Sequence, residues 1–138
     1  NEACPAVRRC RFTSAVGDAF EAMESAGAQG RRYDVVVVDP PSFAQNQAAV
    51  ERAVAAYRRL TALALDVLAP GGLLFQASCS SRVPAERFFA AVADEAARHG
   101  HGLEVVTRTG HPADHPVGFP QGAYLKAILA RRSTTRAR

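Results

Sequence analysis

Two short segments of this chain carry groups suited to covalent chemistry. Asp39, followed by Pro40 and Pro41, ends a run of four valines, and Cys79 stands between two serines in "SCS". A carboxyl group can donate or accept a proton, and a cysteine thiolate is a strong nucleophile. Taken alone, Asp39 could be an ordinary turn acid and Cys79 a small buried hydrophobe. Their matching positions, each just after a strand, favour a functional interpretation.

Those strands belong to a chain that alternates strands with helices. The expected strands are 9–16, 33–39, 73–80, 103–110 and 123–132, and the expected helices are 17–30, 48–68 and 84–100. This alternation predicts a parallel α/β sheet, and the four valines predict a strand buried on both faces. The segment "APGG" at 69–72 predicts a turn, and the last strand, which follows no helix, is expected to insert antiparallel. Ligands of such sheets bind at the carboxyl ends of the strands, so Asp39 and Cys79 should line one crevice.

Composition limits the class of protein. The 138 residues, 48% hydrophobic and 22% charged, are typical of one soluble domain. No apolar run approaches the roughly 20 residues of a membrane helix, so no membrane partner is expected. Three scattered cysteines without a CxxC pair favour a reducing cytoplasm, and the spacing of His111 and His115 suggests no metal site. The net charge of +4, with arginines near both ends, permits a nucleic-acid partner.

Four segments in order carry a resemblance to a known family. They are "GDAF", "YDVVVVDPPSF", "LAPGGLLFQASCS" and "ADHPVGFPQGAYLK". Over about residues 12–131 the chain resembles the C-terminal half of class I S-adenosylmethionine-dependent RNA methyltransferases. The nearest resemblance is to the bacterial 23S rRNA 5-methylcytosine methyltransferases of the large-subunit methyltransferase I type.

The resemblance implies a cofactor, S-adenosyl-L-methionine, and residues that bind it. Gly17 and Asp18 match the segment that borders the adenine, although Asp18 could equally be only a helix N-cap. Asp39 and Pro40 match the motif beside the sulfonium methyl group.

The same resemblance implies how the RNA base is held and attacked. Pro41 and Phe43 match residues that hold the target base, and Cys79 matches the nucleophile of the 5-methylcytosine enzymes. Chemistry gives independent support, because carbon 5 of cytosine becomes nucleophilic only after something adds at carbon 6. A thiolate can add there, and a protonated Asp39 can supply the proton that N3 then needs. The implied substrate is 23S rRNA.

The fold implied by the resemblance is a Rossmann-like methyltransferase sheet, mostly parallel with an antiparallel last strand. The family's first strands, with their glycine-rich loop and ribose-binding acid, have no match in this chain. We therefore expect 1–132 to be the C-terminal part of the catalytic domain, 133–138 to be a basic tail, and cofactor binding by the chain alone to be weak. Two alternatives stay open. One is a methyltransferase of the same fold acting on guanine or adenine nitrogen, and the other is a non-catalytic segment that binds RNA or a partner.

Overall fold

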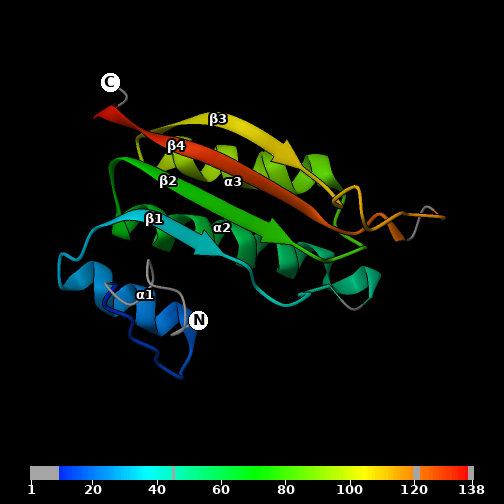
Figure 1. Ribbon diagram of the computed structural model, residues 1–138, viewed down its shortest axis with the longest axis horizontal. Helices are drawn as coiled ribbons and strands as arrows, with labels where there is room; N and C mark the ends of the chain where they lie inside the picture. Colours follow the sequence, from blue (N-terminus) through cyan, green and yellow to red (C-terminus); the bar gives the residue numbers. More distant parts are fainter. Residues whose placement is uncertain (1–9, 45, 120–121, 137–138) are drawn as a thin grey trace.

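The structure is a computed structural model that describes residues 10–44, 46–119 and 122–136 (Figure 1). Its elements in chain order are α1 (Ala19–Ala28), β1 (Tyr33–Val38), the 3-10 helix η1 (Gln47–Ala49), α2 (Val50–Val67), β2 (Leu68–Ser78), α3 (Ala85–Arg98), β3 (His101–Thr109) and β4 (Lys126–Arg136). The helices α1, α2 and α3 and the strands β1 to β4 thus follow the predicted alternation, apart from its first strand.

The four strands form one sheet in the order β1-β2-β4-β3. β1 and β2 are parallel, whereas β4 runs antiparallel to both of its neighbours, β2 and β3 (Figure 1). β1, β2 and β3 therefore point the same way, and the last strand inserts between two of them in the opposite direction. This arrangement confirms the predicted α/β sheet with an antiparallel last strand.

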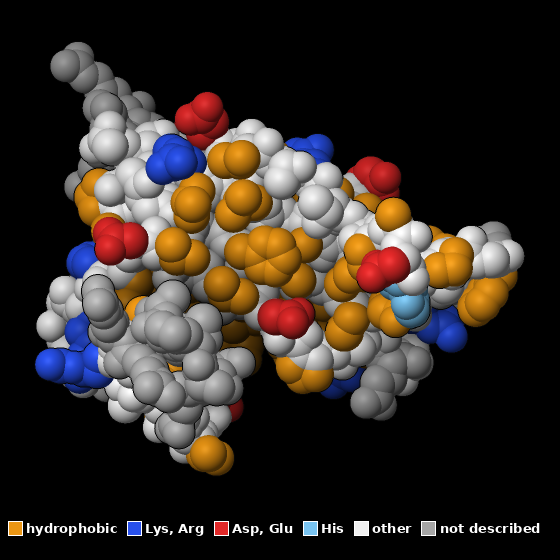
Figure 2. All heavy atoms as spheres, in the orientation of Figure 1, with side chains coloured by type: hydrophobic (Ala, Val, Ile, Leu, Met, Phe, Trp, Pro, Cys, Tyr) orange, Lys and Arg blue, Asp and Glu red, His pale blue; other side chains and the backbone are white. Residues whose placement is uncertain are grey.

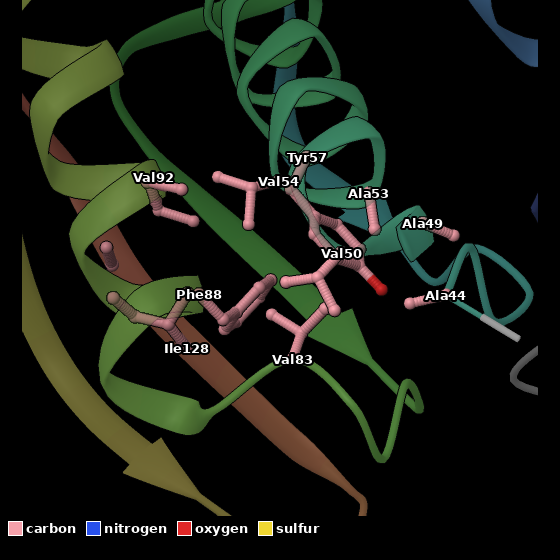
Figure 3. Packing of buried hydrophobic residues seen from close by; sticks show 12 residues of the cluster. Ala44, Ala49, Val50, Ala53, Val54, Tyr57, Val83, Phe88, Val92 and Ile128 are labelled. Atoms are coloured by element: carbon pink, nitrogen blue, oxygen red, sulfur yellow. The ribbon is translucent and has the colours of Figure 1, made fainter. Parts of the chain in front are cut away.

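The helices α2 and α3 lie side by side behind the sheet in Figure 1 and build the core with it. Figure 3 shows Val54 and Tyr57 of α2 meeting Phe88 of α3, with Ile128 of β4 beneath them. The rings of Tyr57 and Phe88 pack edge to face with centroids 5.2 Å apart. Each such large apolar side chain contributes about 1.5–3 kcal/mol when it is fully buried.

The opposite face of the sheet is open in the described part of the chain. Val35 and Val37 of β1 are 57% and 64% exposed, while Val38 is buried. Figure 2, drawn in the orientation of Figure 1, shows hydrophobic side chains gathered over this face. The prediction that β1 is buried on both faces is therefore wrong. Alternation along the strand sends every second side chain to the face away from α2 and α3, and no described helix covers that face.

The strand predicted at 9–16 is also wrong for its described residues, 10–16, which form no strand. Phe12 and Val16 are exposed there. A strand depends on hydrogen bonds to a neighbour, and among the described residues β1 forms its ladder with β2 alone. An alternating hydrophobic pattern forms a strand only where another strand is available to pair with it.

The segment 69–72 is part of β2 and not a separate turn. The strand is irregular there, because the register between β1 and β2 shifts from Tyr33↔Leu68 to Val35↔Leu73. Gly71 has a φ of +79°, a conformation that glycine adopts without strain. The glycines therefore form a bulge inside the strand. At the other end of the sheet, β4 extends to Arg136, so the expected basic tail at 133–138 overlaps that strand.

Candidate active site

Asp39, Pro40, Pro41 and Cys79 line one pocket of about 660 Å³. The loop between β3 and β4 forms its other wall, with His111, Pro112, Asp114, His115, Tyr124 and Leu125. The pocket lies at the carboxyl ends of β1 and β2, where the strand order predicts a ligand site. Six of the ten lining residues can take part in proton transfer or nucleophilic attack: Asp39, Cys79, His111, Asp114, His115 and Tyr124.

The parallel pairing of β1 with β2 brings the two predicted segments together. Val38 is in register with Gln76, so Pro40 and Cys79 leave their strands at the same edge. The Cys79 thiol donates a long hydrogen bond to the carbonyl oxygen of Pro40, with 3.9 Å between sulfur and oxygen. The prediction that Asp39 and Cys79 line one concavity is confirmed.

A buried hydroxyl network fixes both segments from behind. Ser80 Oγ lies 2.9 Å from Tyr57 Oη and 3.1 Å from Ser42 Oγ, and it accepts from the Phe43 amide at 3.1 Å. Ser78 Oγ donates to Tyr57 Oη at 2.7 Å. The serines on either side of Cys79 thus tie the thiol-bearing strand end to helix α2 and to the segment that follows Asp39. Buried polar groups that are all satisfied in this way hold a unique geometry.

Phe43 lies with this network and not among the described lining residues of the pocket. Its ring packs against Tyr57 with centroids 5.3 Å apart, at the junction of the two buried clusters. The structure therefore separates Phe43 from Asp39, Pro40 and Pro41. A role in holding the base stays a prediction, and the contacts that the structure shows are those of a residue that anchors the loop.

Gly17 and Asp18 also lie outside the described pocket lining. Asp18 is the N-cap of α1, and its Oδ1 atom accepts from the amides of Phe20 at 2.8 Å and Glu21 at 3.2 Å. The structure thus gives Asp18 a capping role. Contact with the adenine of a cofactor stays a prediction.

Sequence reasoning missed the aromatic cluster on the far wall of the pocket. The rings of His111 and His115 stack with centroids 4.9 Å apart, and His111 meets Tyr124 edge to face at 4.7 Å. His111 Nε2 accepts from the Leu125 amide at 3.1 Å, so a neutral His111 carries its proton on Nδ1. One feature of the sequence could have indicated this cluster. Its residues lie in the loop before β4, and β4 pairs with β2, the strand that ends at the "SCS" segment.

Lys126 was missed as well. It opens β4, in register with Ser78 of β2, and it is only 5% exposed. Its Nζ atom donates to the carbonyl oxygens of Ser80 and, at 3.1 Å, Tyr124. Burial lowers the pKa of this ammonium, and the nearby Cys79 sulfur acts in the opposite direction.

The pocket has a donor and acceptor set that fits a cationic ligand. Two carboxylates, Asp39 and Asp114, face it, and no lysine or arginine is among its described lining residues. A sulfonium ion with an amino group suits such surroundings better than a phosphate does. Among the residues that the structure describes, no three His, Cys, Asp or Glu side chains group in a way that could hold a metal ion.

Comparison with known proteins decides the family. Residues 13–131 match the family of S-adenosylmethionine-dependent methyltransferases. The chain belongs to this family. It is 38% identical over 121 residues to "Ribosomal RNA large subunit methyltransferase I" of Shewanella amazonensis, and 36% identical over 116 residues to the protein of that name from Yersinia pseudotuberculosis. These matches cover 86% and 83% of the chain, and 31% and 29% of the relatives.

A solved structure confirms the fold. The crystal structure of SMU.776 complexed with SAH superposes with a TM-score of 0.68 at 23% identity, covering 84% of this chain and 30% of that one. The chain therefore spans about a third of the length of its relatives and matches a methyltransferase sheet over most of its own length. Within the described ranges, no helix is long and apolar enough to cross a bilayer.

Proposed function

We propose that the natural gene product containing this sequence methylates carbon 5 of a cytosine in 23S rRNA, with S-adenosyl-L-methionine as methyl donor. The observation that carries the proposal is the shared pocket of Cys79 and Asp39. The names of the relatives favour a large-subunit rRNA as the substrate. In this proposal residues 1–132 are the C-terminal part of the catalytic domain and 133–138 a basic extension, and the chain's arginines contact the RNA phosphates.

Cys79 performs the first step in this proposal. Its thiolate forms a bond to carbon 6 of the cytosine, and the electrons of the 5,6 double bond make carbon 5 nucleophilic. The hydrogen bond from Cys79 to Pro40 places the sulfur at the pocket wall, within reach of a base held beside Asp39. The bound cofactor supplies an electrophilic methyl group at carbon 5.

Asp39 controls the proton on N3 of the base. Addition at carbon 6 raises electron density at N3, and a protonated carboxyl group can neutralise it by donating a hydrogen bond or its proton. Pro40 and Pro41 restrict the backbone next to that carboxyl, because a proline ring fixes its own φ and limits the residue before it. In the proposed cofactor site, Asp39 and Pro40 lie beside the sulfonium, and Gly17 and Asp18 border the adenine.

The last step needs a base that removes the proton from carbon 5. Asp114 and His115 line the wall formed by the β3–β4 loop and are two candidates for this base. When the proton leaves, the bond between sulfur and carbon 6 breaks and the aromatic ring is restored. The proposed nucleophile, the proposed acid and both candidate bases therefore line one pocket.

The direct test uses the natural gene product, a methyl-labelled cofactor and an unmodified 23S rRNA transcript. Digestion to nucleosides and mass spectrometry should find 5-methylcytidine, and Cys79→Ala should abolish it. Cys10→Ala is the matched control, because Cys10 is exposed and lies outside the pocket, and should retain activity. Label on a guanine or adenine nitrogen would replace the proposal with the nitrogen-methylating alternative, which needs no thiol.

A further inference from the structure

The chain holds a single lysine, and that lysine is buried. Of its 17 basic residues, 16 are arginines and the exception is Lys126. Arginine keeps its charge in almost any surroundings, whereas the amine of lysine is compact and responds to its environment. The basic residue beside the candidate active site is therefore the one whose charge can respond to its surroundings.

The contacts of Lys126 lack the usual partner of a buried cation. In the described residues no carboxylate lies within salt-bridge distance of its Nζ atom. Two of the three N–H donors are directed to the carbonyl oxygens of Ser80 and Tyr124. Carbonyl oxygens satisfy hydrogen bonds without neutralising the charge. Burying an ammonium under these conditions is costly, and such a group is a candidate for a function.

Lys126 contacts the chain on the side of the proposed nucleophile, Cys79. Lys126 is in register with Ser78, one residue before Cys79, and it bonds the carbonyl of Ser80, one residue after. Cys79 is the group whose charge acts on Lys126 against the effect of burial. Attraction of this kind is reciprocal, since two coupled groups each favour the charged form of the other.

We infer that Lys126 is the positioning residue of the Cys79 nucleophile: its ammonium fixes the turn after Cys79 and favours the thiolate over the thiol. The inference rests on the proposed function for the role of the thiolate. The coupling between the Lys126 amine and the Cys79 thiol can be measured without any methylation assay.

The first measurement is the alkylation rate of Cys79 by iodoacetamide as a function of pH. It uses the full 138-residue chain with Cys4→Ser and Cys10→Ser, so that Cys79 is its one thiol, and intact-mass detection from about pH 6 to about pH 10. Lys126→Met keeps the length of the side chain and removes its charge. We expect this variant to shift the rate midpoint to higher pH and to lower the rate at neutral pH about tenfold.

Two variants separate charge from structure. Lys126→Arg restores a cation at the same position and should return the midpoint toward that of the parent. Arg82→Met removes an exposed positive charge three residues after Cys79 and should leave the midpoint unchanged. The remaining titratable groups around Cys79 are present in every variant: Asp39, His111, Asp114, His115 and Tyr124. A folded Lys126→Met protein with the parent's midpoint would overturn the inference.

The second measurement does not require any change at Lys126. Labelling with carbon-13 lysine gives one ε-carbon signal, because the chain has one lysine, and its pH titration reports the charge of that amine. Cys79→Ala should move the titration midpoint of Lys126 to lower pH, since the thiolate that favours the ammonium is gone. An unchanged titration would overturn the inference even if Lys126→Met does not fold. A shifted midpoint in a protein that forms no 5-methylcytidine would keep the coupling and reject the proposed function.

Discussion

The thiol of Cys79 donates a hydrogen bond across 3.9 Å to the carbonyl oxygen of Pro40, joining the ends of two adjacent parallel strands. Cys79 and Asp39 line the same pocket. The hydrogen bond depends on the pairing of β1 with β2 and on the hydroxyl network beneath both strand ends.

Asp39→Asn should impair turnover strongly in the natural gene product. An amide can accept a hydrogen bond at N3 or donate a weak one, but it cannot supply the acidic proton, so methylation should slow by about 10²- to 10⁴-fold. Asp34→Asn is the matched control, because Asp34 is an exposed acid of β1 outside the pocket. Single-turnover methylation measures both variants. Equal rates for Asp39→Asn and the parent would remove Asp39 from the mechanism.

Tyr57→Phe should destabilise the fold through the buried hydroxyls. The substitution keeps the ring packed on Phe88 and removes the oxygen that Ser78 and Ser80 contact. Leaving buried hydroxyls without this partner costs about 1–3 kcal/mol in the free energy of unfolding, which urea titration measures. Tyr33→Phe, at an exposed tyrosine, should change the value by less than about 0.5 kcal/mol. Similar values for the two variants would contradict a structural role for the network.

Gly72→Ala should destabilise the bulge of β2. A Cβ atom at this position would lie 2.8 Å from Leu68 Cδ1 and 2.9 Å from the carbonyl oxygens of Ala69 and Asp34. Backbone atoms cannot move away without disturbing the β1–β2 ladder, so we expect a loss of about 1–3 kcal/mol. Gly118→Ala has open space around the added methyl group and serves as the control. Thermal unfolding of both variants, followed by circular dichroism, would show the difference. Equal unfolding temperatures for Gly72→Ala and Gly118→Ala would contradict a packing role for Gly72.

The open face of β1 should make the isolated chain prone to self-association. Val35 and Val37 expose apolar surface on a strand whose outer edge has no neighbour among the described residues. The double variant Val35→Thr, Val37→Thr should lower dye binding to exposed apolar surface and the sedimentation of aggregates, with little change in stability. Val38→Thr is the control on the buried side and should lower stability instead. If the double variant associates as strongly as the parent, self-association does not depend on Val35 and Val37.

The sequence predicts the parts of this site that follow from local pattern. A β-branched run ending in "DPP" and a second strand ending in "SCS" are enough to expect Asp39 and Cys79 at one sheet edge, because parallel neighbours share their carboxyl ends. The antiparallel last strand is predictable for a similar reason, since no helix precedes it.

The parts that the sequence does not predict depend on long-range pairing. Lys126 reaches the Ser80 carbonyl from 46 residues away, and only the insertion of β4 beside β2 makes that contact. In the sequence, Tyr57 is one of several apolar positions on the same face of a helix. Its role in the hydroxyl network depends on Ser78, which only the fold brings to its hydroxyl group. Two predictions from hydrophobic pattern were wrong: burial of β1 on both faces and a strand at 10–16. The pattern does not reveal whether a neighbouring layer or strand is present.

The most direct test of the central claim is covalent trapping of Cys79. An rRNA transcript made with 5-fluorocytidine gives a base whose carbon 5 carries no proton to remove after methylation, so the thiol cannot be released. Incubated with the cofactor and the natural gene product, it should give a complex that survives denaturation, with the RNA attached to the peptide containing Cys79. Cys79→Ala should give no such complex, whereas Cys10→Ala should give as much as the parent. A Cys79→Ala protein that still forms the adduct, or that still makes 5-methylcytidine at the parent's rate, would contradict the account.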